Sequence, residues 1–311
     1  GNVYLTLDAD LQEAVYNILE ESIAGILLDK IRNVKVYNST GRASDIIIPI
    51  DDVYFALFNN NVIDMEHLAL EDAGEYEKEV YQAFLSWRER VLSRLQQELY
   101  TDRTPYDQLD AEFQTYESYI VNDLLIDGSG VLTVDSQDPV YQQWASDESL
   151  SLSEFLEYAI AQNWIDVTEL DMEESYADSS EVFDRLVDFI VRKLDSKTFY
   201  KEMYRFMIRG NAITGRQVCM ILIEQKLVSV TEEEEAALAS GSVSSYDFMK
   251  ELISELQITP AQLALNPYSG SCVVVDPNSG EVLALVSYPS YDNNRLANGI
   301  DAAYYSGLQS D

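Results

Sequence analysis

The chain has 311 residues, of which 47% are hydrophobic and 11% aromatic, so it can form about two folded domains and is not an unstructured polymer. Its 55 acidic and 20 basic side chains give a formal net charge of -35. This charge argues against binding to nucleic acid or to an anionic membrane surface, because both require a basic face. The acidity is typical of a solvated surface that keeps a protein soluble, and divalent-cation binding is the sharper alternative.

No apolar run approaches the roughly 20 residues that cross a bilayer, and the chain begins with Gly1 instead of Met. We therefore expect a piece excised from a longer protein, without that protein's anchoring or targeting segments. The two cysteines, Cys219 and Cys272, lie in apolar stretches and are expected to be buried free thiols. A disulfide between them is an alternative that the sequence leaves open.

The N-terminal stretch VYLTLDADLQEAVYNILEESIAGILLDKI predicts a short strand and then a long helix. Val3, Leu5 and Leu7 alternate with other residues as in a strand. Asp8 or Asp10 can then cap the helix.

Most of the chain from residue 32 to 258 has the apolar spacing of helices. One predicted helix begins at Asp51, and TPYD at 104–107 is expected to start another, with Thr104 as its cap. SLSE at 151–154 is a capping box. Further helices are predicted at about 76–95, 180–194, 197–209, 215–227, 232–240, 246–256 and 259–267.

The helical spacing ends after Pro267. SCVVV and EVLALVSY are apolar, β-branched runs joined by DPNSG, whose residues favour a tight turn. We predict a β-hairpin, and its nearly continuous apolar runs indicate strands covered on both faces. The predicted fold class is mainly α, a multi-helix domain with a small β element formed by this hairpin, with the N-terminal strand as a further candidate member.

The patterns of common catalytic and metal sites do not occur in the sequence. Its single histidine, His67, is expected to be a surface or capping residue, and the cysteines lack metal-ligand spacing. NDLLIDGSGVLTVD departs from a calcium loop because Leu125 and Val134 occupy ligand positions, and TEEEE at 231–235 suits the first turn of a helix. No carboxylate pair or phosphate-binding loop stands out, so we predict no catalytic, cofactor-binding or metal-binding residue.

Two separated stretches resemble the penicillin-binding proteins. LTLDADLQEAVYNILEE is similar to the segment that precedes the transpeptidase domain in that family, and GSCVVVDPNSGEVLALVSYPSYDNNRLANG is similar to the hairpin that opens this domain. The tail SYPSYDNN favours class B, the monofunctional transpeptidases. The resemblance implies a linking strand and helix at 1–31, an acidic helical insertion at 32–258, and the start of the transpeptidase domain at 259–311.

The family's acyl transfer requires a Ser-x-x-Lys motif and a Lys-Thr/Ser-Gly motif. No lysine of this chain has a serine three residues before it, and neither Lys-Thr-Gly nor Lys-Ser-Gly occurs. Ser287 and Ser290 are therefore not nucleophiles of this type. We expect a non-catalytic fragment that ends upstream of the catalytic serine.

For the intact protein, the resemblance implies cross-linking of peptidoglycan stem peptides by serine acyl transfer, and acylation of the same serine by β-lactams. It also implies a location on the extracytoplasmic face of the bacterial cell membrane, with an N-terminal transmembrane anchor outside these residues, and it implies no cofactor. The insertion is expected to position the enzyme or to bind cell-wall, division or elongation proteins through exposed aromatic side chains.

Two other interpretations stay open. In the first, the chain is a free-standing acidic helical interaction or adaptor domain. In the second, it is a cation-binding wall protein.

If the helical segment is a true insertion, it must leave and return at neighbouring points. The two family-like stretches should then lie side by side.

Overall fold

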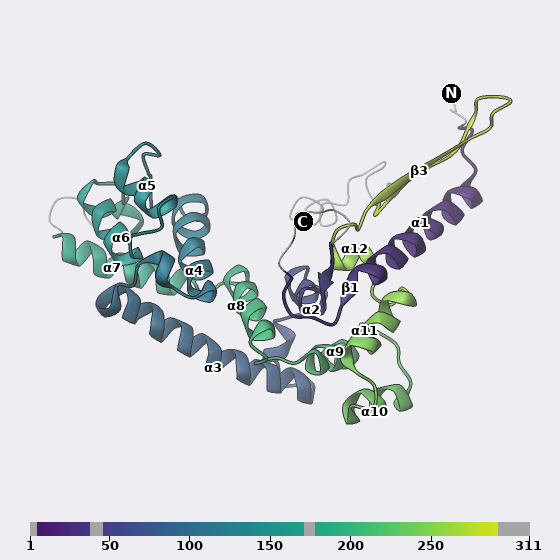
Figure 1. The fold of residues 1–311 in the computed structure, drawn as a ribbon, viewed down its shortest axis with the longest axis horizontal. Helices are drawn as coiled ribbons and strands as arrows, with labels where there is room; N and C mark the ends of the chain where they lie inside the picture. The colour runs from purple at the N-terminus through teal and green to yellow at the C-terminus, as the bar shows by residue number, and fades with distance from the viewer. Residues whose placement is uncertain (1–4, 38–45, 171–177, 292–311) are drawn as a thin grey trace. The chain divides into compact units, whose positions relative to one another are not determined.

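The computed structural model describes residues 5–37, 46–170 and 178–291, and the predicted mainly helical fold is confirmed (Figure 1). The chain forms two compact units. The first joins Gly1–Met65 to Val218–Asp311, and the second is the intervening segment Glu66–Gln217. None of the helices in the described part of the chain is both long and apolar enough to cross a membrane.

The first unit combines elements from both ends of the chain. Its helices are α1 (Ala9–Lys30), α2 (Ile50–Asn59), most of α9 (Gly215–Glu224), α10 (Glu232–Ser240), α11 (Ser245–Ser254) and α12 (Pro260–Leu263). Its strands are β1 (Ile31–Arg32) and β2 (Ile48–Pro49), which pair in parallel, and β3 (Gly270–Val275) and β4 (Val282–Tyr288), which pair antiparallel.

The start of α1 follows one of the two predicted caps. The carboxylate of Asp8 accepts a hydrogen bond from the backbone N–H of Leu11 at 3.0 Å, which satisfies a donor that the first turn leaves free. The predicted strand before it is wrong in its described part, because residues 5–7 have no regular strand structure. Val3 lies outside the described residues.

The predicted C-terminal hairpin is confirmed. Val273 of β3 lies opposite Leu285 of β4, and the turn between the strands is held by Asp276, whose carboxylate accepts from the N–H of Asn278 at 2.8 Å. Gly280 has φ +75°, a left-handed conformation that favours glycine at this end of the turn.

The second unit is helical and continuous in sequence. Its elements are η2 (His67–Ala69), α3 (Glu75–Gln97), η3 (Glu98–Asp102), η4 (Tyr106–Gln108), α4 (Ala111–Ser118), η5 (Tyr119–Gly128), α5 (Pro139–Ala145), α6 (Leu152–Ala161), η6 (Val167–Leu170), α7 (Ser179–Lys193) and α8 (Lys197–Arg209). Here η3 and η5 are π-helical turns that continue α3 and α4.

Aromatic side chains fill the centre of the second unit. The rings of Phe84 and Tyr204 stack with centroids 5.2 Å apart, and Tyr116 meets Phe199 edge-on at 5.2 Å. Such offset and T-shaped contacts add to the stabilisation from apolar burial. This cluster buries the apolar stripes that the helical spacing of α3, α4 and α8 predicts.

Two predicted features of this region are wrong in detail. Pro105 precedes a single 3-10 turn, η4, and α4 begins only after Asp110, which accepts from the N–H of Phe113 at 3.1 Å and displaces the expected cap Thr104. The stretch DGSGVLTVDSQDP at 127–139 predicts a loop by its glycine and aspartate content, but its first two residues belong to η5, which extends to Gly128. The capping box of Ser151 is confirmed.

The segment limits implied by the resemblance, 1–31, 32–258 and 259–311, stay a prediction. The two compact units follow different limits, because residues 32–65 and 218–258 belong with the N-terminal helix and the hairpin.

Candidate functional site

The two stretches that resemble penicillin-binding proteins pack against each other in the first unit. Val15 of α1 forms one buried cluster with Ala284 and Val286 of β4. The half-buried side chains around this cluster are Leu11, Tyr16, Leu19, Cys272 and Val274. Figure 1 shows the hairpin running along α1, which confirms the expectation that these stretches lie side by side.

Polar contacts from the N-terminal stretch cover the outer edge of β4. The N–H of Asp8 donates to the carbonyl of Leu283 at 2.9 Å, and the hydroxyl of Thr6 donates to that of Val282 at 2.6 Å. The N–H of Leu285 donates to the side chain of Gln12. Because an open strand edge carries unpaired backbone groups, these contacts tie the end of the sheet to the start of α1.

Tyr288 connects three elements at the other end of β4. Its ring lies 5.3 Å from that of Tyr16, and its hydroxyl accepts a hydrogen bond from the N–H of Ala261 at 3.1 Å. The side chain is almost fully buried, and this burial raises the pKa of Tyr288 to about 12. Its phenol is therefore a neutral structural group that joins α1, β4 and the start of α12.

The opposite face of the hairpin is open. Val273, Val275 and Leu285 are 55%, 48% and 60% exposed, although cross-strand apolar pairs of this kind are usually covered. The prediction that both faces are covered is therefore wrong for this chain, because α1 covers one face only. The open face is the candidate interaction surface of the first unit.

Two residues of the first unit that lie on either side of the helical segment in sequence are hydrogen-bonded to each other. The N–H of Asp64 donates to the side-chain oxygen of Gln225 at 2.9 Å, and the amide nitrogen of Gln225 returns a hydrogen bond to the carbonyl of Asp64 at 2.9 Å. This reciprocal pair joins the segment before residue 66 to the residue that follows α9.

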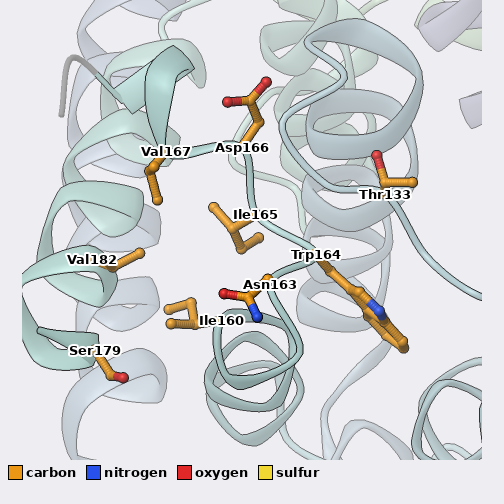
Figure 2. A pocket seen from close by; sticks show the side chains of 9 residues that line it. All are labelled: Thr133, Ile160, Asn163, Trp164, Ile165, Asp166, Val167, Ser179 and Val182. Carbon is orange, nitrogen blue, oxygen red and sulfur yellow. The ribbon is translucent and has the colours of Figure 1, made fainter. Parts of the chain in front are cut away.

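A cavity of about 570 Å³ in the second unit is a further candidate site (Figure 2). It lies where α6 and α7 approach the connection that follows α6. Its lining residues are Thr133, Ile160, Asn163, Trp164, Ile165, Asp166, Val167, Ser179 and Val182.

The lining of this cavity offers little chemistry. Hydrogen bonds from the hydroxyl and N–H of Thr168 occupy the carboxylate of Asp166 and lower its pKa. In Figure 2 the indole ring of Trp164 extends away from Val182 and Ile165. Asp166 caps its own turn, and Trp164 has no group that could act as a nucleophile or a base. These side chains therefore do not form a nucleophile–base pair.

The residues considered from sequence for other chemistry have structural roles. Nδ1 of His67 lies 2.8 Å from a carboxylate oxygen of Glu77, whose other oxygen accepts from the N–H of Gly74 and so caps α3. In the part of the chain that the structure describes, no group of three or more acidic, histidine or cysteine side chains could hold a metal ion. The stretch NDLLIDGSGVLTVD, at residues 122–135, begins within the π-helical turn η5 and leaves it after Gly128.

Both cysteines are free thiols. Cys219 is fully buried in α9, and this burial raises its pKa. Cys272 is half-buried in β3.

Among the aromatic side chains of the described helical segment, Tyr100 is the clearest candidate for an external contact, with 48% of its surface exposed. Its hydroxyl donates to Asp184 at 3.0 Å, and its ring meets Phe183 edge-on. The other described rings of the second unit are either buried, as Phe113 and Phe199 are, or half-buried, as Trp87 and Tyr119 are. Binding of a partner through such rings stays a prediction.

The candidate site is a helix packed on a β-hairpin, and a long helical segment separates the two in sequence. The chain is similar to the peptidoglycan D,D-transpeptidase MrdA of Haemophilus influenzae, with 27% identity over 162 residues. That region is 52% of this chain and only 22% of the relative. The similarity supports a distant relationship to the penicillin-binding transpeptidases. No family model matches the chain, and no solved structure matches it.

Proposed function

We propose that the chain is a non-catalytic part of a class B penicillin-binding protein. In this proposal the first unit contributes the linking helix and the opening hairpin of a transpeptidase domain, and the second unit is an insertion that positions the enzyme or binds partner proteins. The intact protein would cross-link peptidoglycan stem peptides on the extracytoplasmic face of the membrane, where β-lactams would acylate its active serine.

The packing of α1 on β3 and β4 carries the proposal. These elements are separated by most of the chain, yet each resembles a segment that is consecutive in penicillin-binding proteins, and Val15, Ala284 and Val286 join them in one core. The similarity to a peptidoglycan D,D-transpeptidase also supports this relationship.

The open face of the hairpin fits this proposal. Val273 and Leu285 are an apolar cross-strand pair exposed to solvent, and the remaining strands and helices of a transpeptidase domain would cover them. The chemistry would come from those remaining elements, because Ser-x-x-Lys and Lys-Thr/Ser-Gly do not occur in these 311 residues.

The gene sequence and a labelling experiment test the proposal. Reading the gene beyond the codon for Asp311 should reveal Ser-x-x-Lys within roughly 100 codons and Lys-Thr/Ser-Gly later. A fluorescent penicillin should label the full-length product and leave the 311-residue chain unlabelled. A stop codon directly after Asp311 would instead support a free-standing helical adaptor, and stoichiometric labelling of the short chain would refute its assignment as non-catalytic.

A further inference from the structure

Helices α3 and α4 of the second unit meet through side chains of opposite charge. A guanidinium nitrogen of Arg90 lies 2.6 Å from the carboxylate of Glu112, and Arg94 forms an ion pair with Asp110. The guanidinium of Arg94 also lies over the ring of Phe113, 3.8 Å from its centroid. Basic residues on α3 therefore face acidic and aromatic residues at the start of α4.

Two buried glutamates depart from this pairing of basic residues with acidic residues. Glu98, which follows α3, is 5% exposed, and Glu117, at the end of α4, is 1% exposed. Glu98 accepts a hydrogen bond from the N–H of Thr104 at 3.2 Å and lies 3.5 Å from Nε of Arg94. By contrast, Oε2 of Glu117 is buried without a hydrogen-bond partner among the described residues.

Both glutamates lie where an α-helix changes to a π-helical turn. Glu98 is the first residue of η3, and Glu117 precedes the last residue of α4, after which η5 begins. Short π-helical turns within α-helices are uncommon and are often associated with function. The two buried glutamates therefore lie at the irregular part of each helix.

The groups around Glu117 favour its neutral form. Burial is the main cause, and the nearby carboxylate of Glu98 adds to it, so the pKa of Glu117 rises to about 8 although Arg94 opposes the shift. Burial raises the pKa of Tyr106 in η4, and the carboxylates of Glu148 and Glu117 add to this shift. A buried like-charge pair is unfavourable unless one member holds a proton.

Helix α8 also packs on α4. Its half-buried carboxyl group, Glu202, interacts with Arg205, Asp123 and Arg209.

We propose that Glu98 and Glu117 form a proton-dependent latch between the α3–η3 and α4–η5 helices. With a proton on Glu117 the two helices stay packed, and loss of that proton places two negative charges in one buried site and releases α4 and η5. The latch is a property of the second unit and does not depend on the proposed transpeptidase relationship.

The comparison of Glu117→Gln with the wild-type chain tests the latch. Glutamine has the shape of the protonated carboxyl group and stays neutral at every pH of the experiment. Hydrogen exchange of backbone amides in residues 111–128, corrected for intrinsic rates, should be measured from pH 5 to 9. Once released and hydrated, Glu117 regains a pKa near its ordinary value of 4.5. The closing equilibrium of the wild type, relative to the variant, should therefore fall about tenfold per pH unit from roughly pH 5 to pH 8 and level off above.

Two further variants control the experiment. Glu112→Gln removes a carboxylate from the same helix interface without touching the buried pair, so it should keep the wild-type pH dependence. Glu98→Gln removes the like charge and should move the upper limit of the pH dependence to lower pH, which tests the pair even if Glu117→Gln does not fold. Identical pH profiles for the wild type and Glu117→Gln, or an unchanged profile in Glu98→Gln, would overturn the proposal.

Discussion

Asp8 controls the beginning of α1 through a single hydrogen bond to the N–H of Leu11. Asp10 is also acidic and lies in the first turn, but it is not the cap. Replacement of a cap by alanine usually costs about 1 kcal/mol. We therefore expect Asp8→Ala to lower the free energy of unfolding of the first unit by about that amount, measured by urea denaturation.

Asp10→Ala is the matched control for this prediction. It removes a carboxylate from the positive end of the same helix, where such a charge contributes only a few tenths of a kcal/mol when exposed. Equal losses for the two variants would show that charge, and not capping, stabilises this end of α1.

The two thiols should differ in reactivity because they differ in burial. Cys219 is fully buried and its pKa is raised, whereas Cys272 is half-buried. Because the thiolate is the reactive form, a thiol reagent should modify Cys272 first in the native chain and both residues in denaturant. Substitution of Cys272 by serine should abolish the fast phase, and a fast phase that persists would contradict this assignment.

At the scale of elements, the hairpin should tolerate changes on one face only. Val286 packs on Val15 of α1 and is 6% exposed, whereas its neighbour Leu285 is 60% exposed. Loss of buried methyl groups costs about 2 kcal/mol at such a site. Val286→Ala should therefore lower the unfolding free energy by about this amount, and Leu285→Ala should change it by less than about 0.5 kcal/mol.

The same two variants also test whether the open face of the hairpin is covered in a longer protein. If the open face of the hairpin is covered by further elements of a transpeptidase domain, Leu285→Ala should destabilise the full-length product although it is neutral here. Thermal unfolding of both lengths makes this comparison. Neutrality in both would argue against burial of this face.

At the scale of the molecule, the second unit should be removable. Asp64 and Gln225 hold the two connections of the first unit together by reciprocal hydrogen bonds, so a short Gly/Ser linker can replace residues 66–217 with little cost in loop-closure entropy. The shortened chain should keep a cooperative unfolding transition. Its hairpin amides should stay protected in hydrogen exchange, and uniform loss of that protection would show that the first unit depends on the second.

The deletion has a direct control. Gln225→Ala in the shortened chain removes the hydrogen bonds to Asp64, and it should lower the unfolding temperature. The effect should exceed that of Gln257→Ala, which removes a side-chain hydrogen bond to the N–H of Ser229 at another half-buried position.

Much of the local structure was predictable from sequence, because its causes are local. The cap of α1, the capping box at Ser151 and the turn at Asp276 each depend on side chains that bond to backbone groups within a few residues. The expected helix start at Thr104 failed because Asp110, a few residues later, caps the helix instead. Local signals of similar strength compete, and only the packing of the apolar face decides between them.

The sequence by itself determined the mainly helical class, the hairpin and the resemblance to penicillin-binding proteins, since these depend on residue type and short-range spacing. Only the tertiary structure decided that α1 covers a single face of the hairpin, and that Glu98 and Glu117 are both buried. Among 55 acidic residues, nothing in the local sequence distinguishes these two. Their special environment arises because the packing of α3 and α4 removes both carboxyl groups from water.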